Sequence, residues 1–303
     1  MKRIKNILIC GIGVIGGYYA SVFERNESCD LRILVDKKRL EHYKNEPRII
    51  NGKSYNFNYI LPSDTTFKAD LIIIATKSSG IKDAINNIKN FVSDESIIMS
   101  FLNGITSEQL LSEVYGKEKV LHSFLLGHTF FREGNNISHD GKANIIYGSI
   151  NNDKKKEKLV EELFKENSIS YIISDDILSE QWNKFCFNSC VNQISAITRM
   201  TFGEIKRSVN CRDLINNICD EIRIIGEKEG VKGANDFKRN TYKSLELMID
   251  SGKTSMLQDI ESRRVPETDI FGETVIKLGE KHNINTPYNR ILTELIKSIS
   301  DSF

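Results

Sequence analysis

The chain has 303 residues, of which 40% are hydrophobic and 27% are charged, and its formal net charge is +1. These values are typical of a globular protein with one large or two ordinary domains. The near-neutral charge argues against a surface dedicated to nucleic acid. The sequence has no apolar run approaching the roughly 20 residues that a membrane-spanning helix needs.

The N-terminal segment and the cysteines indicate the cellular compartment. Glycines follow residues 1–5 too soon for a secretory signal peptide. The six cysteines form neither a CxxC pair nor a dense framework; they are Cys10, Cys29, Cys186, Cys190, Cys211 and Cys219. We therefore expect reduced thiols in a cytoplasmic protein that binds neither nucleic acid nor membranes.

A glycine-rich segment follows the first apolar run. Residues 4–10 are expected to form a buried strand, and residues 18–24 have helical character. Between them a GxGxxG pattern is made by Gly11, Ile12, Gly13, Val14, Ile15 and Gly16. The first glycine of such a pattern permits a tight turn, the second lets a pyrophosphate approach the backbone, and the third allows close packing of helix on strand. The segment therefore predicts a dinucleotide-binding turn.

The end of the second expected strand bears on the choice of cofactor. Residues 31–35 lead into Asp36, twenty positions after Gly16. A carboxylate there would bind the ribose hydroxyls of NAD and repel a 2′-phosphate. Lys37, Lys38 and Arg39 follow at once and could instead bind that phosphate. Charge placement favours NAD only modestly, so both cofactors stay open.

Two further strands are expected at residues 69–76 and 96–101, each followed by a helical run. Strands and helices that alternate in this way predict a doubly wound parallel sheet, whose ligands lie beyond the carboxyl ends of the strands. Lys77 and Asn103 fall at such ends, so we expect both to be functional.

Shorter alternating runs between residues 120 and 175 are expected to complete this sheet, with an antiparallel edge. The runs include residues 143–150 and 168–174, which flank an expected helix at 154–165. His128 and His139 lie in this region without a carboxylate or second histidine at ligand spacing. We expect structural roles for them and no metal site.

The second half of the chain is expected to be helical. Five helices are predicted at residues 179–199, 203–229, 235–250, 267–283 and 288–302. Without a low-complexity linker, the boundary near residue 175 predicts two domains, residues 1–175 and 176–303. The fold class is therefore α/β, a Rossmann-type doubly wound sheet followed by an all-helical domain.

The first of these helices places polar residues four apart beside an apolar surface. Lys184, Asn188 and Asn192 are predicted to lie on one face, each one turn from the next. A solvated stripe is the alternative reading. Ser255 fits a helix N-cap with Gln258 three residues later, and Glu267, directly after Pro266, fits the first turn of the next helix.

Taken together, these motifs resemble the ketopantoate reductase family (2-dehydropantoate 2-reductases). The resemblance rests on GxGxxG, Asn103-Gly104, Trp182-x-Lys184-x3-Asn188-x3-Asn192, and the segment 255–259 with Pro266-Glu267-Thr268-Asp269 after it. It runs over essentially the whole chain. It implies an N-terminal Rossmann domain, a helical C-terminal domain and an active site in the cleft between them, in a monomer or a homodimer.

The resemblance also implies a reaction, the reduction of ketopantoate to D-pantoate by NADPH or NADH on the route to pantothenate and coenzyme A. Lys184 matches the catalytic lysine that binds the keto acid and protonates its carbonyl oxygen. Glu267 matches a glutamate that contacts the nicotinamide ribose and supports the active site. The substrate-binding matches are Asn103, Asn188, Asn192 and Ser255, and the cofactor contacts are Gly11, Gly13, Gly16, Lys77 and Asn103.

Two positions depart from the family pattern. Members that prefer NADPH usually carry a basic residue where this chain has Asp36, and ketopantoate-specific members often have asparagine where it has Phe202. These differences keep a second enzyme open, an NADH-dependent D-2-hydroxyacid dehydrogenase of the mandelate type. A non-catalytic dinucleotide sensor on the same fold is disfavoured, because the lysine and the glutamate are both present.

Overall fold

The computed structural model describes residues 3–127, 130–139 and 143–303. Its chain divides into two compact units. The sheet unit comprises Met1–Leu102 and Ser107–Ile177, and the helical unit comprises Asn103–Thr106 and Leu178–Phe303. A short segment taken from inside the first half of the sequence therefore folds with the second half.

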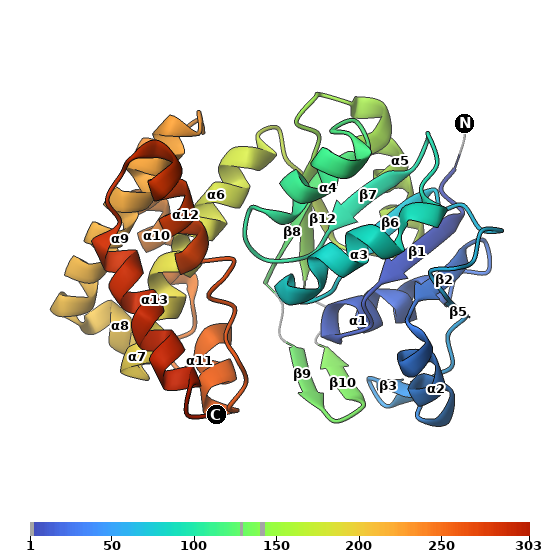
Figure 1. Cartoon of the computed structure of the whole chain (residues 1–303), viewed down its shortest axis with the longest axis horizontal. Helices are drawn as coiled ribbons and strands as arrows, with labels where there is room; N and C mark the ends of the chain where they lie inside the picture. The colour runs from blue at the N-terminus through green and yellow to red at the C-terminus, as the bar shows by residue number, and fades with distance from the viewer. Residues whose placement is uncertain (1–2, 128–129, 140–142) are drawn as a thin grey trace. The chain divides into compact units, whose positions relative to one another are not determined.

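The sheet unit is built on an eight-stranded sheet in the order β12-β11-β8-β7-β6-β1-β2-β5 (Figure 1). Its helices are α1 (Val14–Phe23), α2 (Lys37–Asn45), α3 (Ile81–Asn87), α4 (Ser107–Tyr115) and α5 (Lys154–Glu166), with 3₁₀ turns at η1 (Ser78–Gly80) and η2 (Lys89–Phe91). The strands of this sheet are β1 (Asn6–Cys10), β2 (Asp30–Leu34), β5 (Tyr59–Ile60), β6 (Leu71–Ile74), β7 (Ile97–Ser100), β8 (Val120–Leu126), β11 (Asn144–Gly148) and β12 (Tyr171–Ile173).

The central strands are parallel and buried on both faces. Strand β1 pairs in parallel with β2 and β6, and Ile7 lies opposite both Leu31 and Leu71. Its residues alternate between two cores, since Ile7 and Ile9 pack in one and Leu8 and Cys10 in the other. Strand β11 runs antiparallel to β8, which confirms the expected antiparallel edge. The α/β fold class is confirmed.

A second, four-stranded sheet, in the order β4-β3-β10-β9, was not predicted. Its strands are β3 (Arg48–Ile50), β4 (Lys53–Tyr55), β9 (Phe130–Glu133) and β10 (Asn136–His139). It packs on α1, where a Cβ added to Gly17 would lie 3.0 Å from Cδ1 of Ile137. His139 of β10 stacks on Tyr18, with ring centroids 3.6 Å apart, which is a structural role. His128 lies outside the described residues.

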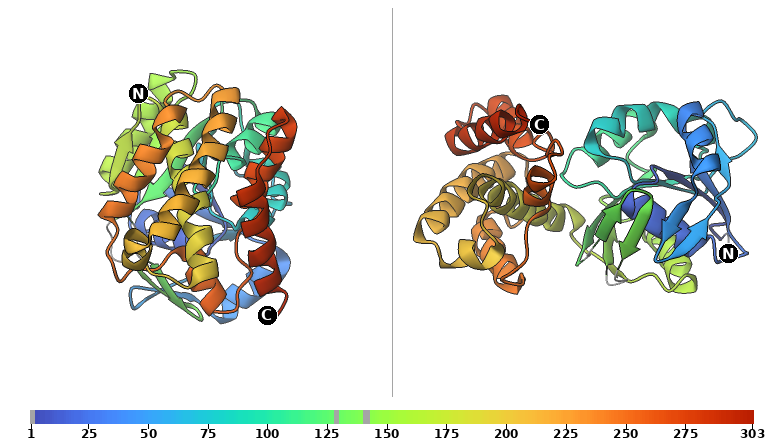
Figure 2. Two further views of the ribbon diagram at one scale, coloured as in Figure 1. Left: turned by 90° about the vertical axis from the view of Figure 1, so that its left-hand side faces the viewer. Right: turned by 90° about the horizontal axis from the view of Figure 1, so that it is seen from below.

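The helical unit contains α6 to α13, shown from two further sides in Figure 2. Its elements are α6 (Ile177–Phe187), η3 (Asn188–Asn192), α7 (Gln193–Thr198), α8 (Phe202–Arg207), α9 (Val209–Lys228), η4 (Ala234–Asp236), α10 (Phe237–Leu247), α11 (Ser255–Glu261), α12 (Gly272–His282) and α13 (Pro287–Ser300). Among the described residues, the structure has no helix that is both long enough and apolar enough to cross a membrane.

Three local expectations in this unit are wrong. The helix expected at residues 203–229 is two helices, because Ser208 caps a new one by accepting a hydrogen bond from the Cys211 amide (3.2 Å). Thr254, rather than Ser255, caps α11, since its hydroxyl accepts from the Leu257 amide (3.1 Å). Glu267 precedes α12 by five residues and lies in a loop, because that helix begins at Gly272.

Candidate active site

Two glycines of the glycine-rich turn, Gly11 and Gly16, lie where a Cβ would clash with neighbouring backbone atoms. Gly11 adopts φ +101°, and a Cβ there would lie 2.7 Å from the backbone carbonyl of Ala75. A Cβ on Gly16 would lie 1.9 Å from the carbonyl oxygen of Gly11. The first glycine therefore permits the turn beside β6, and the third lets α1 pack against it.

Gly13, the second glycine of the pattern, faces open space. It is the N-cap of α1 with φ −72°, and a Cβ added there would meet no protein atom within 4 Å. Because Gly13 has no side chain to cap the helix, backbone amides of the first turn are left to bind an anion. Ile12 is buried, and Val14 and Ile15 pack against the core, so these three residues offer backbone atoms to a ligand. The turn fits a pyrophosphate.

Two side chains beside the turn, those of Cys10 and Thr76, are uncharged. Burial raises the pKa of the Cys10 thiol to about 12, so the residue before the turn carries no negative charge that would repel phosphates. The hydroxyl of Thr76 is buried and has no hydrogen-bond partner among the described residues. Thr76 follows β6 beside Gly11 and was missed from the sequence, which gives no signal of an unsatisfied hydroxyl. Lys77 comes next, exposed, just before η1.

Asp36 has a structural role that was not predicted. It is the N-cap of α2, and its Oδ1 accepts a hydrogen bond of 2.7 Å from the Arg39 amide. Its Oδ2 lies 3.3 Å from Nη1 of Arg39, and half of the side chain is exposed. Lys37 and Lys38 lie exposed in the same helical turn. The carboxylate is thus oriented by the helix and still accessible to a ribose.

Lys184 and Asn103 are joined within the helical unit. The ammonium of Lys184 donates a hydrogen bond of 3.0 Å to Oδ1 of Asn103, and the pair is partly buried. Gly104, with φ +88°, allows the chain beside Asn103 to approach Ile270, since a Cβ there would lie 3.0 Å from Cβ of Ile270. The structure therefore brings together two predicted site residues that are 81 positions apart.

The helix that contains Lys184 changes from α-helical to π-helical at the two asparagines, Asn188 and Asn192. Residues Asn188–Asn192 form a single π-helical segment between α6 and α7. Its wider turn pairs residues five apart, so a spacing of four is less than one full turn. The three polar residues therefore do not follow one regular α-helix. Asn192 is buried at 4% exposure and Asn188 is half-buried.

A buried polar network supports this π-helical segment. Nε2 of Gln193 donates to the Ser189 carbonyl (2.7 Å) and to Oδ1 of Asn289 (3.0 Å). Nδ2 of Asn289 donates to Glu221 (2.7 Å), which also accepts from the backbone amide of Tyr288 (2.8 Å). Burial raises the pKa of Glu221, which these hydrogen bonds partly counteract. The network ties α9 and α13 to the segment that bears the asparagines.

The remaining predicted residues lie at the start of α11 and in the loop after it. Ser255 is exposed at the first position of α11, and that helix packs against η3 and α7. Glu267 is half-buried in the following loop, next to the buried Pro266 and three residues before Ile270. The same loop thus contacts Gly104, the neighbour of Asn103.

The sequence matches family models and known proteins over most of its length. Residues 7–152 match the family model described as Ketopantoate reductase PanE/ApbA, and residues 176–300 match the model of its C-terminal domain. Uncharacterized oxidoreductase YkpB of Bacillus subtilis (strain 168) is 25% identical over 285 residues, covering 92% of this chain and 94% of that protein. A 2-dehydropantoate 2-reductase of Streptococcus pyogenes serotype M1 is 26% identical over 308 residues, covering 96% of each.

One solved structure shares the fold over nearly the whole chain. The ternary structure of D-mandelate dehydrogenase with NADH and anilino(oxo)acetate superposes with a TM-score of 0.85. The alignment covers 98% of this chain and 99% of that one, at 20% sequence identity. At this identity the likeness concerns the fold alone.

Proposed function

Because the chain belongs to the ketopantoate reductase family of NAD(P)-dependent oxidoreductases, we propose that it reduces ketopantoate to D-pantoate with NADPH or NADH. On this proposal the enzyme works in the cytoplasm and its product enters the route to pantothenate and coenzyme A. The observation that carries the proposal is the hydrogen bond of 3.0 Å between Lys184 and Asn103.

The proposed role of Lys184 follows from its charge and its amide partner. Hydride addition to a ketone builds negative charge on the carbonyl oxygen, which a nearby ammonium stabilises. The hydrogen bond to Asn103 holds the ammonium of Lys184 in place, and we assign this ammonium to the substrate oxygen. Lys184 gives its proton to that oxygen as the alcohol forms, and the neutral amine then takes a proton from water. The bound nicotinamide supplies the hydride.

Neutral side chains are proposed to hold the rest of the substrate. Asn188, Asn192 and Ser255 offer amide and hydroxyl donors to its carboxylate and hydroxyl groups. The buried position of Asn192 and the polar network around Gln193 support this role, because a fixed donor loses less entropy on binding.

The cofactor contacts are assigned residue by residue. We assign the pyrophosphate to the turn from Gly11 to Gly16, and the adenosine ribose to Asp36. Lys77, Asn103 and Glu267 are assigned to the nicotinamide half, and Glu267 is thereby also assigned support of the catalytic site. The open space at Gly13 and the unsatisfied hydroxyl of Thr76 favour a ligand at this turn.

Replacing Lys184 by alanine tests the mechanism. A general acid contributes roughly 10²- to 10⁴-fold to a rate, so Lys184→Ala should lower kcat by about that factor. Its NADH and NADPH dissociation constants, measured by fluorescence titration, should stay within about twofold, because the lysine acts on the keto acid. The exposed Lys277→Ala is the matched control and should keep full turnover. An unchanged kcat in Lys184→Ala would refute the assigned role.

A D-2-hydroxyacid dehydrogenase acting on bulkier keto acids is the second candidate, and Phe202 is the observation that favours it. Phe202 opens α8, and its ring packs against Gly252, where an added Cβ would lie 3.0 Å from Cδ2 of Phe202. A ring at this position in place of an amide favours a more apolar substrate. The test measures NADH and NADPH oxidation with ketopantoate, 2-ketoisovalerate and phenylglyoxylate. Fast turnover of ketopantoate alone supports the first candidate, and faster turnover of phenylglyoxylate supports the second.

A further inference from the structure

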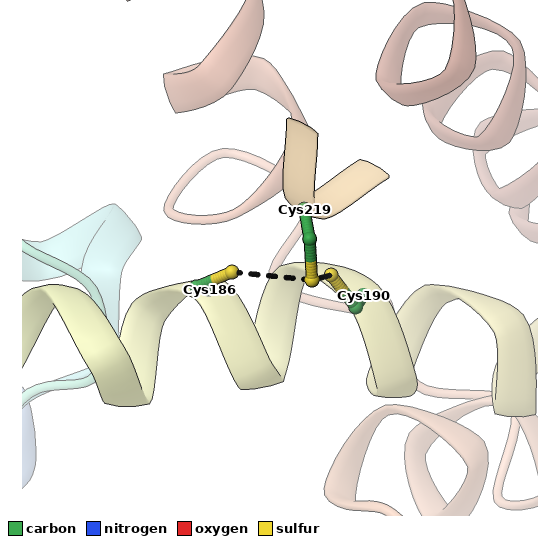
Figure 3. A group of neighbouring side chains, drawn as sticks. All are labelled: Cys186, Cys190 and Cys219. Carbon is green, nitrogen blue, oxygen red and sulfur yellow. Dashed lines mark hydrogen bonds between the residues drawn. The ribbon is translucent and has the colours of Figure 1, made fainter. Parts of the chain in front are cut away.

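Three cysteines meet in the core of the helical unit. Cys186 comes from α6, Cys190 from η3 and Cys219 from α9 (Figure 3). Their Sγ atoms all lie within 4.8 Å of one another, with 3.7 Å between Cys186 and Cys219 and 3.4 Å between Cys190 and Cys219. Each side chain is completely buried, and all three are free thiols.

The spacing of the sulfurs matches a thiolate metal site. Metal–sulfur bonds of about 2.3 Å place the sulfurs of a tetrahedral or trigonal site roughly 3.8 to 4.0 Å apart. The separations from Cys219 are 3.4 and 3.7 Å, so these two would lengthen by a few tenths of an ångström around a metal, and the sulfurs of Cys186 and Cys190 lie within 4.8 Å of each other. Cys186 and Cys190 are four residues apart on one helix, and Cys219 completes the triangle from another helix, as Figure 3 shows.

The two ordinary explanations of neighbouring cysteines account for this arrangement less well. A buried cysteine can serve simply as a small apolar residue, but apolar packing does not require three sulfurs to face one another. A disulfide would join only two of them and leave the third thiol beside it.

We propose that Cys186, Cys190 and Cys219 bind one Cu(I) ion as a three-thiolate site. Thiolates favour soft cations, which selects Cu(I) and Zn²⁺ over Mg²⁺ or Ca²⁺. Structural zinc sites take four nitrogen or sulfur ligands, and the group found among the described residues contains only the three cysteines. The nearest polar neighbour is the Thr241 hydroxyl, 3.6 Å from the sulfur of Cys186, which is a hard and neutral donor. Each thiol that binds releases its proton to solvent.

This site was not foreseen, since the sequence predicted no metal. The i,i+4 pair Cys186 and Cys190 was visible, but the contribution of Cys219 from 29 residues beyond Cys190 was not. The site is independent of the proposed reductase activity, because metal uptake is measured without substrate or cofactor.

The test is an anaerobic competition titration of the fully reduced whole chain. Cu(I) is supplied as its acetonitrile complex against the chromogenic chelator bicinchoninate, and a parallel arm supplies Zn²⁺ with a zinc indicator. We expect the protein to withdraw one equivalent of Cu(I), and X-ray absorption at the copper edge to show a first shell of sulfur only. Cys219→Ser and Cys190→Ser should each weaken Cu(I) binding by about 100-fold or more, because loss of a ligand costs at least as much as the roughly 10- to 100-fold loss on changing an outer-shell partner.

Cys211→Ser is the matched control. Cys211 is buried in the same unit and its sulfur contacts Met200 at 3.7 Å, outside the cluster, so this variant should bind copper like the wild type. Failure of the wild-type protein to take up Cu(I) would overturn the proposal without any variant, and so would a nitrogen or oxygen first shell. Tighter binding of Zn²⁺ than of Cu(I), or full binding by folded Cys219→Ser, would also overturn it.

Discussion

Gly13→Ala separates the binding role of the glycine-rich turn from its folding role. The added methyl group would meet no protein atom within 4 Å, and the φ of −72° suits alanine. Losing glycine at a helix N-cap costs about 0.5–1 kcal/mol, and the stiffer unfolded chain returns about 0.4–1 kcal/mol. The free energy of unfolding should therefore change by less than about 1 kcal/mol.

Cofactor binding should respond strongly to the same change. The methyl group would occupy the space assigned to the pyrophosphate, and each hydrogen bond between a backbone amide and a phosphate contributes about 1.5–3 kcal/mol. Losing one such bond raises the dissociation constant about 10- to 150-fold. Titrations followed by NADH and NADPH fluorescence measure this change, and urea unfolding measures the stability.

Gly16→Ala is the contrasting variant, because its Cβ would lie 1.9 Å from the carbonyl oxygen of Gly11. The backbone must move to relieve that contact, so we expect a stability loss of about 3 kcal/mol or more. Wild-type cofactor affinity in Gly13→Ala would show that the pyrophosphate does not lie at Gly13, which would refute the reasoning. A large stability loss in Gly13→Ala would refute the premise that the space around Gly13 is open.

Three further changes test the cofactor assignment and two polar groups of the helical unit. Asp36→Asn keeps a helix-capping oxygen but removes the charge, so affinity for NADPH should rise several-fold relative to NADH with little loss of stability; an unchanged ratio would contradict the ribose assignment. Glu221→Ala removes the acceptor of three hydrogen bonds from Tyr288 and Asn289, and urea unfolding should show a loss of about 2–4 kcal/mol. Burial opposes ionisation of Glu229, but hydrogen bonds from Lys281 and His282 lower its pKa below 4.5 in the folded state. Its contribution to stability is therefore present above pH 4.5 and is lost as the pH falls through the folded pKa, so Glu229→Gln should show a shallower loss of unfolding free energy in acid; an equal slope would contradict this.

The sheet was predictable because its central strands are buried on both faces. Runs such as Leu71–Ile74 are apolar at every position, and this pattern is visible without any partner strand. The four-stranded second sheet was missed because its strands are only three or four residues long and carry no such run. Helix α2 and its cap Asp36 were not predicted, because a carboxylate followed by Lys37-Lys38-Arg39 at a strand end is equally typical of a ribose- or phosphate-binding position.

The candidate site was only partly predictable for a different reason. The glycine pattern is local, so its residues could be named from the sequence. The contact between Lys184 and Asn103 spans 81 positions, and the two were grouped through a family resemblance rather than through spacing. The π-helical segment depends on Gln193 and Asn289, 96 positions apart, and local sequence carries no signal of that contact. Pro266 predicted a helix that starts at residue 267, but the helix begins at Gly272.

The interrupted sequence of the helical unit limits how this protein can be divided. Asn103–Thr106 folds with Leu178–Phe303, although seventy-one residues of the sheet unit, Ser107–Ile177, separate the two in the chain. A gene fragment that starts at Leu178 would encode Lys184 without the amide that accepts its hydrogen bond. Transplanting residues 178–303 onto another dinucleotide-binding domain would therefore remove this hydrogen bond, unless the new host supplied an Asn-Gly at the corresponding strand end. Recombination in this family should accordingly succeed by exchanging whole chains more readily than by exchanging halves.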